Sequence, residues 1–144
     1  MSSITVATHL PAPPEVVWAD VERLASHVEW MADAERITFR DGPTSGVGTV
    51  MDVHTAIGPL RTTDVIEITE WEPPHRMGVR HRGAVAGTGA FTIEPDGSGS
   101  TFTWTETLHF PWFFGGAIGA WCARPIFTRI WRRNLDRLTT RFSG

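Results

Sequence analysis

Apolar side chains recur at every second position over most of the chain, which is the period of a half-buried β-strand. On this basis strands are expected at 4–9, 37–40, 49–57, 60–71, 76–82, 87–94 and 100–109. Turn signals rich in Gly, Pro and Asp separate the later strands. Because connections this short favour antiparallel neighbours, the pattern predicts one antiparallel sheet.

The pattern changes to a helical period directly after the first strand. Pro14 suits the first position of a helix, and apolar residues follow it at helical spacing. Ser26 and Glu29 have the spacing of a capping box, in which each side chain bonds an exposed backbone amide. The sequence therefore predicts two short helices, the second of which starts at His27 and carries Trp30.

Residues 110–142 contain the one long helical pattern and eight of the fifteen aromatic residues. The helix is expected to begin near Pro111 or a few residues later, weakened at first by three glycines. Pro125 is expected to kink or restart it. The apolar stripe that follows Pro125 indicates packing against the sheet, while arginines occupy the opposite face.

Composition indicates a single domain over residues 1–144. The net charge of −3 gives no reason to expect a nucleic-acid partner, but it is unevenly distributed: residues 1–110 carry −8 and residues 111–144 carry +5. Lysine and tyrosine are absent, which excludes a Schiff-base lysine and a tyrosine acid. Cys122 is the one cysteine and is interpreted as a small packed residue. Neither a leader nor a membrane-spanning segment is expected, so we expect a cytoplasmic protein.

Several segments together resemble one known superfamily. They are the run ThrHisLeuProAlaProProGluValValTrp at 8–18 with Trp30, the glycines around Val47, the TrpGluProProHisArg turn at 71–76 and the GlySerThrPheThrTrp strand at 99–104. The chain resembles the START-like or Bet v 1-like (SRPBCC) superfamily, and within it the polyketide cyclase/dehydrase and lipid-transport branch. The resemblance implies an α+β helix-grip fold, in which a curved seven-stranded antiparallel sheet grips a long C-terminal helix and ligands sit between them.

Strand alternation predicts which side chains face that interior. The residues expected to line a ligand cavity are Trp30, Met51, Val53, Ile66, Met77, Val79, Phe91, Phe102, Trp104, Trp121, Phe127 and Trp131. Asp64, His81 and Glu106 fall on the same, otherwise apolar, faces and are the candidate catalytic residues. A carboxyl group in a dry cavity has a raised pKa, and histidine titrates near neutral pH, so both suit acid–base chemistry. Alternatively, each lies at a wetted strand end or pairs with an arginine such as Arg61, Arg80 or Arg82.

Other motifs indicate little further chemistry. The six histidines form no metal-ligand pair, so no metal site and no cofactor is expected. The pairs Gly87-Thr88-Gly89 and Gly97-Ser98-Gly99 are interpreted as bulge and turn residues rather than phosphate-binding loops.

Three functional hypotheses follow. The first is binding of a hydrophobic small molecule such as a lipid, polyketide or isoprenoid. The second, which the resemblance implies, is a polyketide aromatase/cyclase, although no arginine–tyrosine pair can be matched. The third is a non-catalytic module that forms a homodimer or touches a membrane through the aromatic surface between Trp112 and Trp121.

Overall fold

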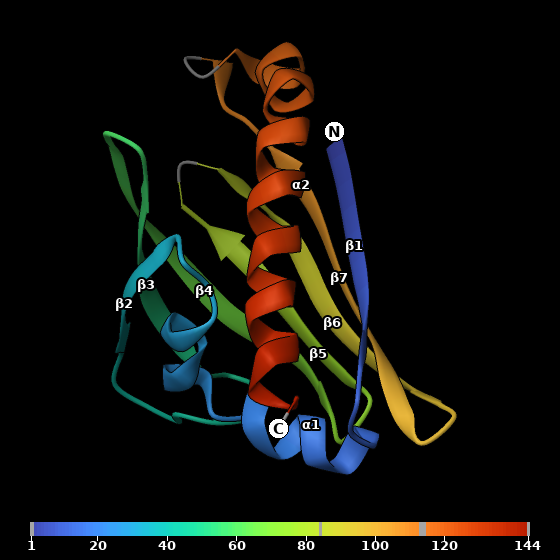
Figure 1. Ribbon diagram of the computed structural model, residues 1–144. Coiled ribbons are helices and arrows are strands. Elements are labelled where there is room, and N and C mark those ends of the chain that lie inside the picture. The colour runs from blue at the N-terminus through green and yellow to red at the C-terminus, as the bar shows by residue number, and fades with distance from the viewer. Residues whose placement is uncertain (1, 84, 113–114, 144) are drawn as a thin grey trace.

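The computed structural model describes residues 2–83, 85–112 and 115–143 (Figure 1). The elements are, in chain order, β1 (Ser2–Leu10), α1 (Pro14–Val21), the 3-10 helix η1 (Leu24–Glu29), β2 (Ala34–Phe39), β3 (Val50–Ile57), β4 (Leu60–Glu72), β5 (Arg76–Arg82), β6 (Ala86–Asp96), β7 (Gly99–His109) and α2 (Gly116–Arg141). The predicted strands are confirmed, with bounds that differ by a few residues at most.

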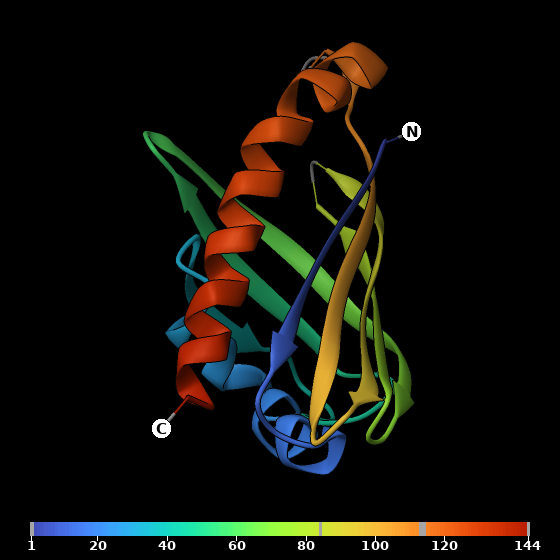
Figure 2. The same ribbon diagram turned by 45° about the vertical axis from the view of Figure 1, so that its right-hand side comes forward.

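The strands in these ranges form one sheet of seven in the order β1-β7-β6-β5-β4-β3-β2, and every neighbouring pair is antiparallel. The sheet is curved, and α2 crosses its inner side, as Figures 1 and 2 show. The chain passes from β1 at one edge to β2 at the other through α1, at the lower end in Figure 1, and η1, which lies above it beside β2. The predicted α+β helix-grip fold is confirmed.

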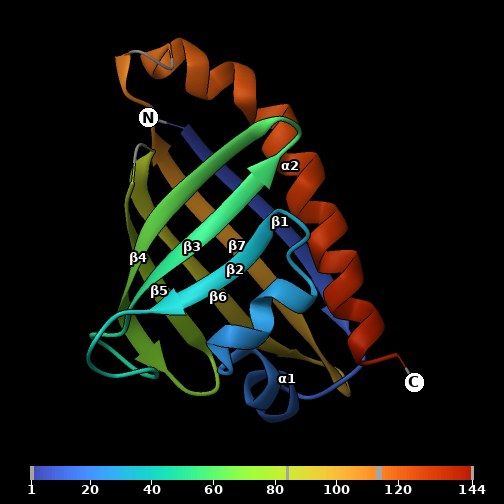
Figure 3. The ribbon, with the colours of Figure 1, turned by 90° about the vertical axis from the view of Figure 1, so that its left-hand side faces the viewer.

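Helix α2 continues through Pro125 as one element. Figure 3 shows its orange first part running at an angle to the red remainder. Because a proline ring displaces the preceding turn and removes one backbone hydrogen bond, a bend here is the expected consequence. The helix is preceded by Gly115, whose φ of 88° lies in the left-handed region. After the bend, Trp131, Leu135 and Leu138 are buried against the sheet, as the apolar stripe predicted.

The capping-box prediction is wrong. The second short helix is a 3-10 helix that begins at Leu24, three residues before the expected start, and its N-cap is Arg23. The hydroxyl of Ser26 is buried and donates to the carbonyl of Arg23 at 2.7 Å, so it bonds backward along the chain instead of capping the following turn. Trp30 follows directly and is completely buried.

Candidate functional site

A cavity of about 370 Å³ lies between the inner face of the sheet and α2. Its wall is mainly apolar and comes from β2 to β7, from η1 and the segment after it, and from α2. Nine of the twelve side chains expected to line the cavity lie on this wall: Met51, Val53, Ile66, Met77, Val79, Phe91, Trp104, Phe127 and Trp131. Strand phase thus predicted which way the seven strand residues among them point, while Phe127 and Trp131 lie on α2.

Three residues expected on the wall lie elsewhere. Trp30 and Phe102 are completely buried, and their rings pack edge to face at 6.3 Å. They sit behind the wall residues Phe91 and Trp104, whose ring centres lie 5.8 and 6.1 Å from that of Trp30. Trp121 lies on the outward side of α2, where 69% of it is exposed. Phe102 was misplaced because strand alternation predicts the face on which a side chain lies but not how deeply it is buried. Trp121 was misplaced because it lies in a turn of α2 that precedes the buried apolar stripe.

The cavity reaches the surface at one end of the molecule. Leu60, on the wall beside the β3–β4 turn, is 52% exposed, and Val85 and Phe110 belong to the wall near the same end. In Figure 1 these turns and the first part of α2 form the upper end of the molecule. We call this end the mouth of the cavity. At the opposite, lower end lies α1, whose Val17, Trp18 and Val21 are buried.

Asp64, His81 and Glu106 all line the cavity. His81 Nε2 lies 2.6 Å from Glu106 Oε2, and the other carboxylate oxygen of Glu106 accepts a hydrogen bond of 3.0 Å from the indole N–H of Trp104. Asp64 lies on β4, on the other side of His81. The structure thus brings the three predicted titratable residues together in one polar patch on the wall.

Gly89 leaves the space for the His81–Glu106 contact. His81 is on β5 and Glu106 on β7, so the pair spans the intervening strand β6, where Gly87 and Gly89 face them. A Cβ atom at Gly89 would lie 2.6 Å from Glu106 Oε1, and one at Gly87 would collide with the backbone carbonyl of Thr107. The register of β6 is regular on both sides, so the interpretation of these glycines as bulge residues is wrong.

The surrounding charges set the pKa of His81. Burial lowers it, but the negative charge of Glu106, the hydrogen bond to that carboxylate and the charge of Asp64 outweigh burial, so the pKa is raised above its ordinary value. A histidine with a raised pKa binds its proton more tightly than a free side chain does, and it can donate that proton to a bound molecule. Glu106, which is engaged on both oxygens, positions the ring.

Burial also raises the pKa of the Asp64 carboxyl group. The charge of His81 partly opposes this effect, and the charges of Glu106 and Asp33 add to it. The arginines that were considered as partners pair elsewhere: Arg61 with Glu35 at 2.8 Å, and both Arg80 and Arg82 with Glu67. The polar patch is therefore not neutralised by arginine.

Some wall residues were not predicted. His27, Asp33 and Thr62 also line the cavity. His27 donates from Nε2 to the carbonyl of Val21 at 2.7 Å, and burial lowers its pKa to about 4, so the ring is neutral near pH 7. Thr62 continues the alternation of Asp64 and could have been found from it. His27 and Asp33 lie outside the predicted strands, where no period marks the inward side.

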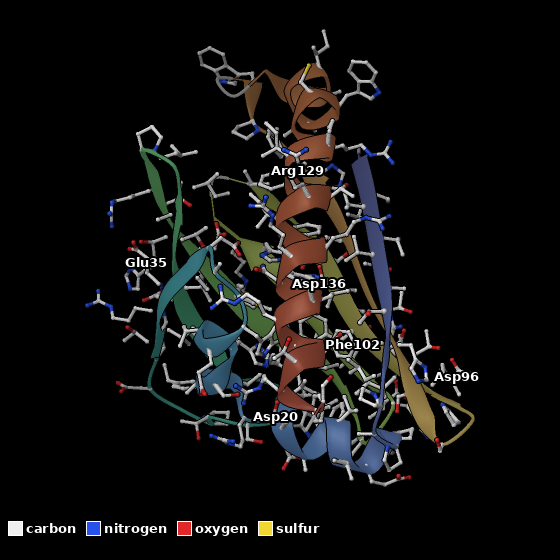
Figure 4. The ribbon with its side chains drawn as sticks, in the orientation of Figure 1. Asp20, Glu35, Asp96, Phe102, Arg129 and Asp136 are labelled. Carbon is white, nitrogen blue, oxygen red and sulfur yellow. The ribbon has the colours of Figure 1, made fainter. Side chains whose placement is uncertain are left out.

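The outward face of α2 forms a shallow depression that contains Trp121, Arg129, Arg132 and Arg133. Figure 4 shows Arg129 on this face, which is turned away from the sheet. Near it, Ile118 is 76% exposed. Trp112 is 87% exposed, whereas Phe113 and Phe114 of the predicted aromatic surface lie outside the described residues.

Within the described ranges, His, Cys, Asp and Glu side chains form no group of three or more that could hold a metal ion. No helix in the same ranges is long and apolar enough to cross a membrane.

Comparison with solved structures agrees with the architecture. A crystal structure of a Thermus thermophilus protein superposes with a TM-score of 0.82 at 18% identity, covering 98% of this chain and 97% of that one. The protein XoxI from Bacillus cereus superposes with a TM-score of 0.77 at 16% identity, covering 99% of this chain and 96% of that one. A Nitrosospira multiformis protein superposes with a TM-score of 0.76 at 12% identity, covering 99% of this chain and 97% of that one. At such identities the likeness concerns the fold alone.

No curated protein sequence matches the chain. A family model does match it, over residues 1–143, and that family is described as polyketide cyclase / dehydrase and lipid transport. The match spans both the sheet and the long helix, and the family fold supports a module that binds a hydrophobic ligand. This chain belongs to the polyketide cyclase / dehydrase and lipid transport family.

Proposed function

We propose that the protein binds a lipid, a polyketide or an isoprenoid-like molecule in the cavity between the sheet and α2. The observation that carries this proposal is the cavity itself, about 370 Å³ with a mainly apolar wall and one polar patch. Ligand sites of this kind usually have volumes of roughly 300–1,000 Å³ and gain affinity from apolar walls and orientation from a few polar groups.

The wall supplies affinity through burial. Each methylene group that leaves water for such a wall contributes about 0.8 kcal/mol. Phe127 and Trp131 on α2 stack at 5.7 Å, and Trp131 stacks on Trp104 of β7 at 4.8 Å, which gives the ligand a flat aromatic surface. The polar patch adjoins this surface where Trp104 bonds Glu106, and it would bind a polar group of the same molecule.

Native mass spectrometry after incubation with a mixed lipid extract tests the proposal. The protein is expected to retain an apolar molecule, and Val79→Trp, which fills the cavity, is expected to reduce retention at least about tenfold. The matched control is Val65→Trp, because Val65 lies on β4 outside the cavity wall. Retention that is equal in both variants, with both folded by circular dichroism, would remove the cavity as the binding site.

A second candidate function is enzymatic, as a polyketide aromatase/cyclase that guides the aldol closure of a bound chain. The observation in its favour is the 2.6 Å contact between His81 and Glu106 inside an apolar cavity. His81, held by Glu106, would donate a proton to a substrate carbonyl, while a carboxylate such as Asp64 would accept one from the adjacent carbon. General acid–base catalysis of this kind contributes roughly 10²–10⁴-fold.

Turnover of a poly-β-keto mimic tests this second function. His81→Gln and Glu106→Gln are each expected to lower the rate at least about 100-fold. Asp52→Asn is the control, since Asp52 on β3 bonds Arg40 at 3.0 Å and does not line the cavity. Equal rates in all three variants would exclude catalysis by the pair and leave ligand binding as the function.

For the outward face of α2 we propose contact with an anionic membrane surface. Its exposed Ile118 and Trp121 precede a row of arginines on the same face, and this order is typical of helices that lie in a membrane interface. Such contact would place the mouth of the cavity near a source of apolar ligand. A homodimer through this face is the alternative.

A further inference from the structure

The ionisable side chains of the cavity carry an excess of negative charge. Among the described residues on the wall they are Asp33, Asp64, Glu106, His27 and His81. The chain has 13 arginines and no lysine, and none of those arginines is among these wall residues. Because these side chains would repel an anion, a mainly apolar cavity lined by them favours a ligand that is not anionic.

Three of these groups are already satisfied within the protein. Glu106 receives hydrogen bonds from both His81 and Trp104, so its charge is matched by that of protonated His81. Asp33 accepts a hydrogen bond of 2.8 Å from the side-chain amide of Asn134, which itself is completely buried. His27 donates to the carbonyl of Val21.

Asp64 differs from them. In the described part of the chain its carboxyl group takes part in no side-chain hydrogen bond or ion pair, and it acts on its neighbours through charge alone. It projects from the middle of the β4 face that lines the cavity, between Thr62 and Ile66. The residue is half-buried and its oxygens are not sealed off, so a hydrogen-bond donor on a molecule in the cavity can reach them.

We propose that the cavity selects amphiphiles whose polar head donates hydrogen bonds to Asp64. It binds a long-chain amine more tightly than a long-chain alcohol, and it rejects fatty carboxylates. The inference rests on the proposed binding function and specifies its ligand class. An ammonium head beside Asp64 would complete a charge pair in a poorly solvated site. A carboxylate head would instead add a further negative charge beside Asp64 and Asp33. Burial, together with the charges of Glu106 and Asp33, raises the pKa of Asp64, and an ammonium head would oppose these effects.

The test compares probes that differ only in the head group. Decylamine, decanol and decanoate are titrated into the protein at neutral pH by calorimetry, and affinity is expected to fall in that order. Asp64→Asn is expected to weaken decylamine at least about tenfold, because a Coulomb pair near a protein surface is worth several times the free energy of a tenfold change. The affinity for decanol is expected to change by less than about threefold in Asp64→Asn, because the side-chain amide still accepts a hydrogen bond. Asp52→Asn serves as the matched control.

The outcomes separate the two proposals. The proposed selectivity is overturned if decanoate binds as tightly as decylamine. It is also overturned if Asp64→Asn leaves the ratio of the decylamine and decanol affinities unchanged. In both cases the proposed ligand binding still stands. Failure of all three probes to bind removes the proposed binding function itself. If Asp64→Asn does not fold, the carboxyl pKa of Asp64 is followed by NMR in the native sequence: decylamine is expected to lower it, and an unchanged pKa contradicts the contact.

Discussion

Gly89 is a single residue on which the polar patch depends. Its missing side chain leaves the space that the Glu106 carboxylate occupies on its way across β6 to His81. Glycine is otherwise unfavourable within a strand, so a functional or steric reason for its presence is expected. Here the reason is the contact between two side chains from strands that are not direct neighbours.

Gly89→Ala is therefore expected to displace Glu106 from His81. Without the carboxylate, burial dominates and the pKa of His81 is expected to fall below its ordinary value. The measurement is a titration of His81 by NMR. Thr88→Ala is the control, because Thr88 is exposed on the other side of the same strand. A pKa equal to that of the unmodified protein would show that Glu106 does not set it.

His27 is expected to make the free energy of unfolding fall at acidic pH. Burial lowers its folded-state pKa to about 4, against 6.5 for the ordinary side chain. Because the unfolded chain binds the proton more tightly, stability is complete above pH 6.5 and is lost as pH falls toward 4. The native protein is expected to lose about 2 kcal/mol more free energy of unfolding than His27→Gln between about pH 7 and pH 4.5.

Urea unfolding at the two pH values measures this difference. Carboxyl groups titrate in both proteins and largely cancel. His109→Gln is the control, because His109 is exposed and should retain the acid sensitivity. Parallel loss of stability in the native protein and in His27→Gln would contradict the assignment of this effect to His27.

At the scale of elements, one ion-pair cluster holds the end of α2. Arg141 bonds Asp20 on α1 through two nitrogens, at 2.7 and 2.8 Å, and Glu29 on η1 at 3.1 Å. Figure 4 shows Asp20 near the lower end of α2. The hydrogen bonds from Arg141 lower the pKa of Asp20 despite its burial. The cluster fixes the end of α2 opposite the mouth.

Arg141→Met is expected to lower the free energy of unfolding by about 1 kcal/mol, because a partly exposed cluster is worth more than one surface pair but is still screened. The pKa of Asp20 should rise toward its ordinary value. Urea unfolding and NMR titration measure the two effects. Arg133→Met, on the outward face of the same helix, is the control. An unchanged pKa of Asp20 would show that Arg141 does not hold α2 here.

The elements also show what a sequence can predict. Strand faces followed from alternation because each strand has one side toward the interior, and this placed Asp64, His81 and Glu106 correctly. The capping box failed because the same serine hydroxyl can bond either the next turn or the preceding carbonyl. The contact across Gly89 was missed because it depends on the register of three strands, which no single segment encodes.

Whether an inward side chain fills the core or borders a void depends on the molecule as a whole. Trp30 and Phe102 point inward like Trp104, but the curvature of the sheet and the course of α2 place them behind the wall. The same holds for charge. The helical period predicted arginines opposite the apolar stripe, but only the fold shows that Trp121 shares a depression with Arg129, Arg132 and Arg133.

Vesicle binding tests the membrane contact proposed for that face. The protein is expected to sediment with vesicles that contain anionic phosphatidylglycerol and much less with neutral phosphatidylcholine vesicles. The double change of Ile118 and Trp121 to Ser should abolish the difference. Val47→Ser, an exposed change in a loop, should not. Loss of a dimer in the double variant without any vesicle binding would assign the face to self-association instead.

The stacked rings of Trp104 and Trp131 have one more consequence. Their planes are 20° apart and their centres 4.8 Å apart, which is close enough for the ultraviolet transitions of the two indoles to couple. Both rings border the cavity. A molecule that enters and alters their stacking would change the exciton signal in circular dichroism, so the chain carries an optical reporter of its own occupancy and needs no attached dye.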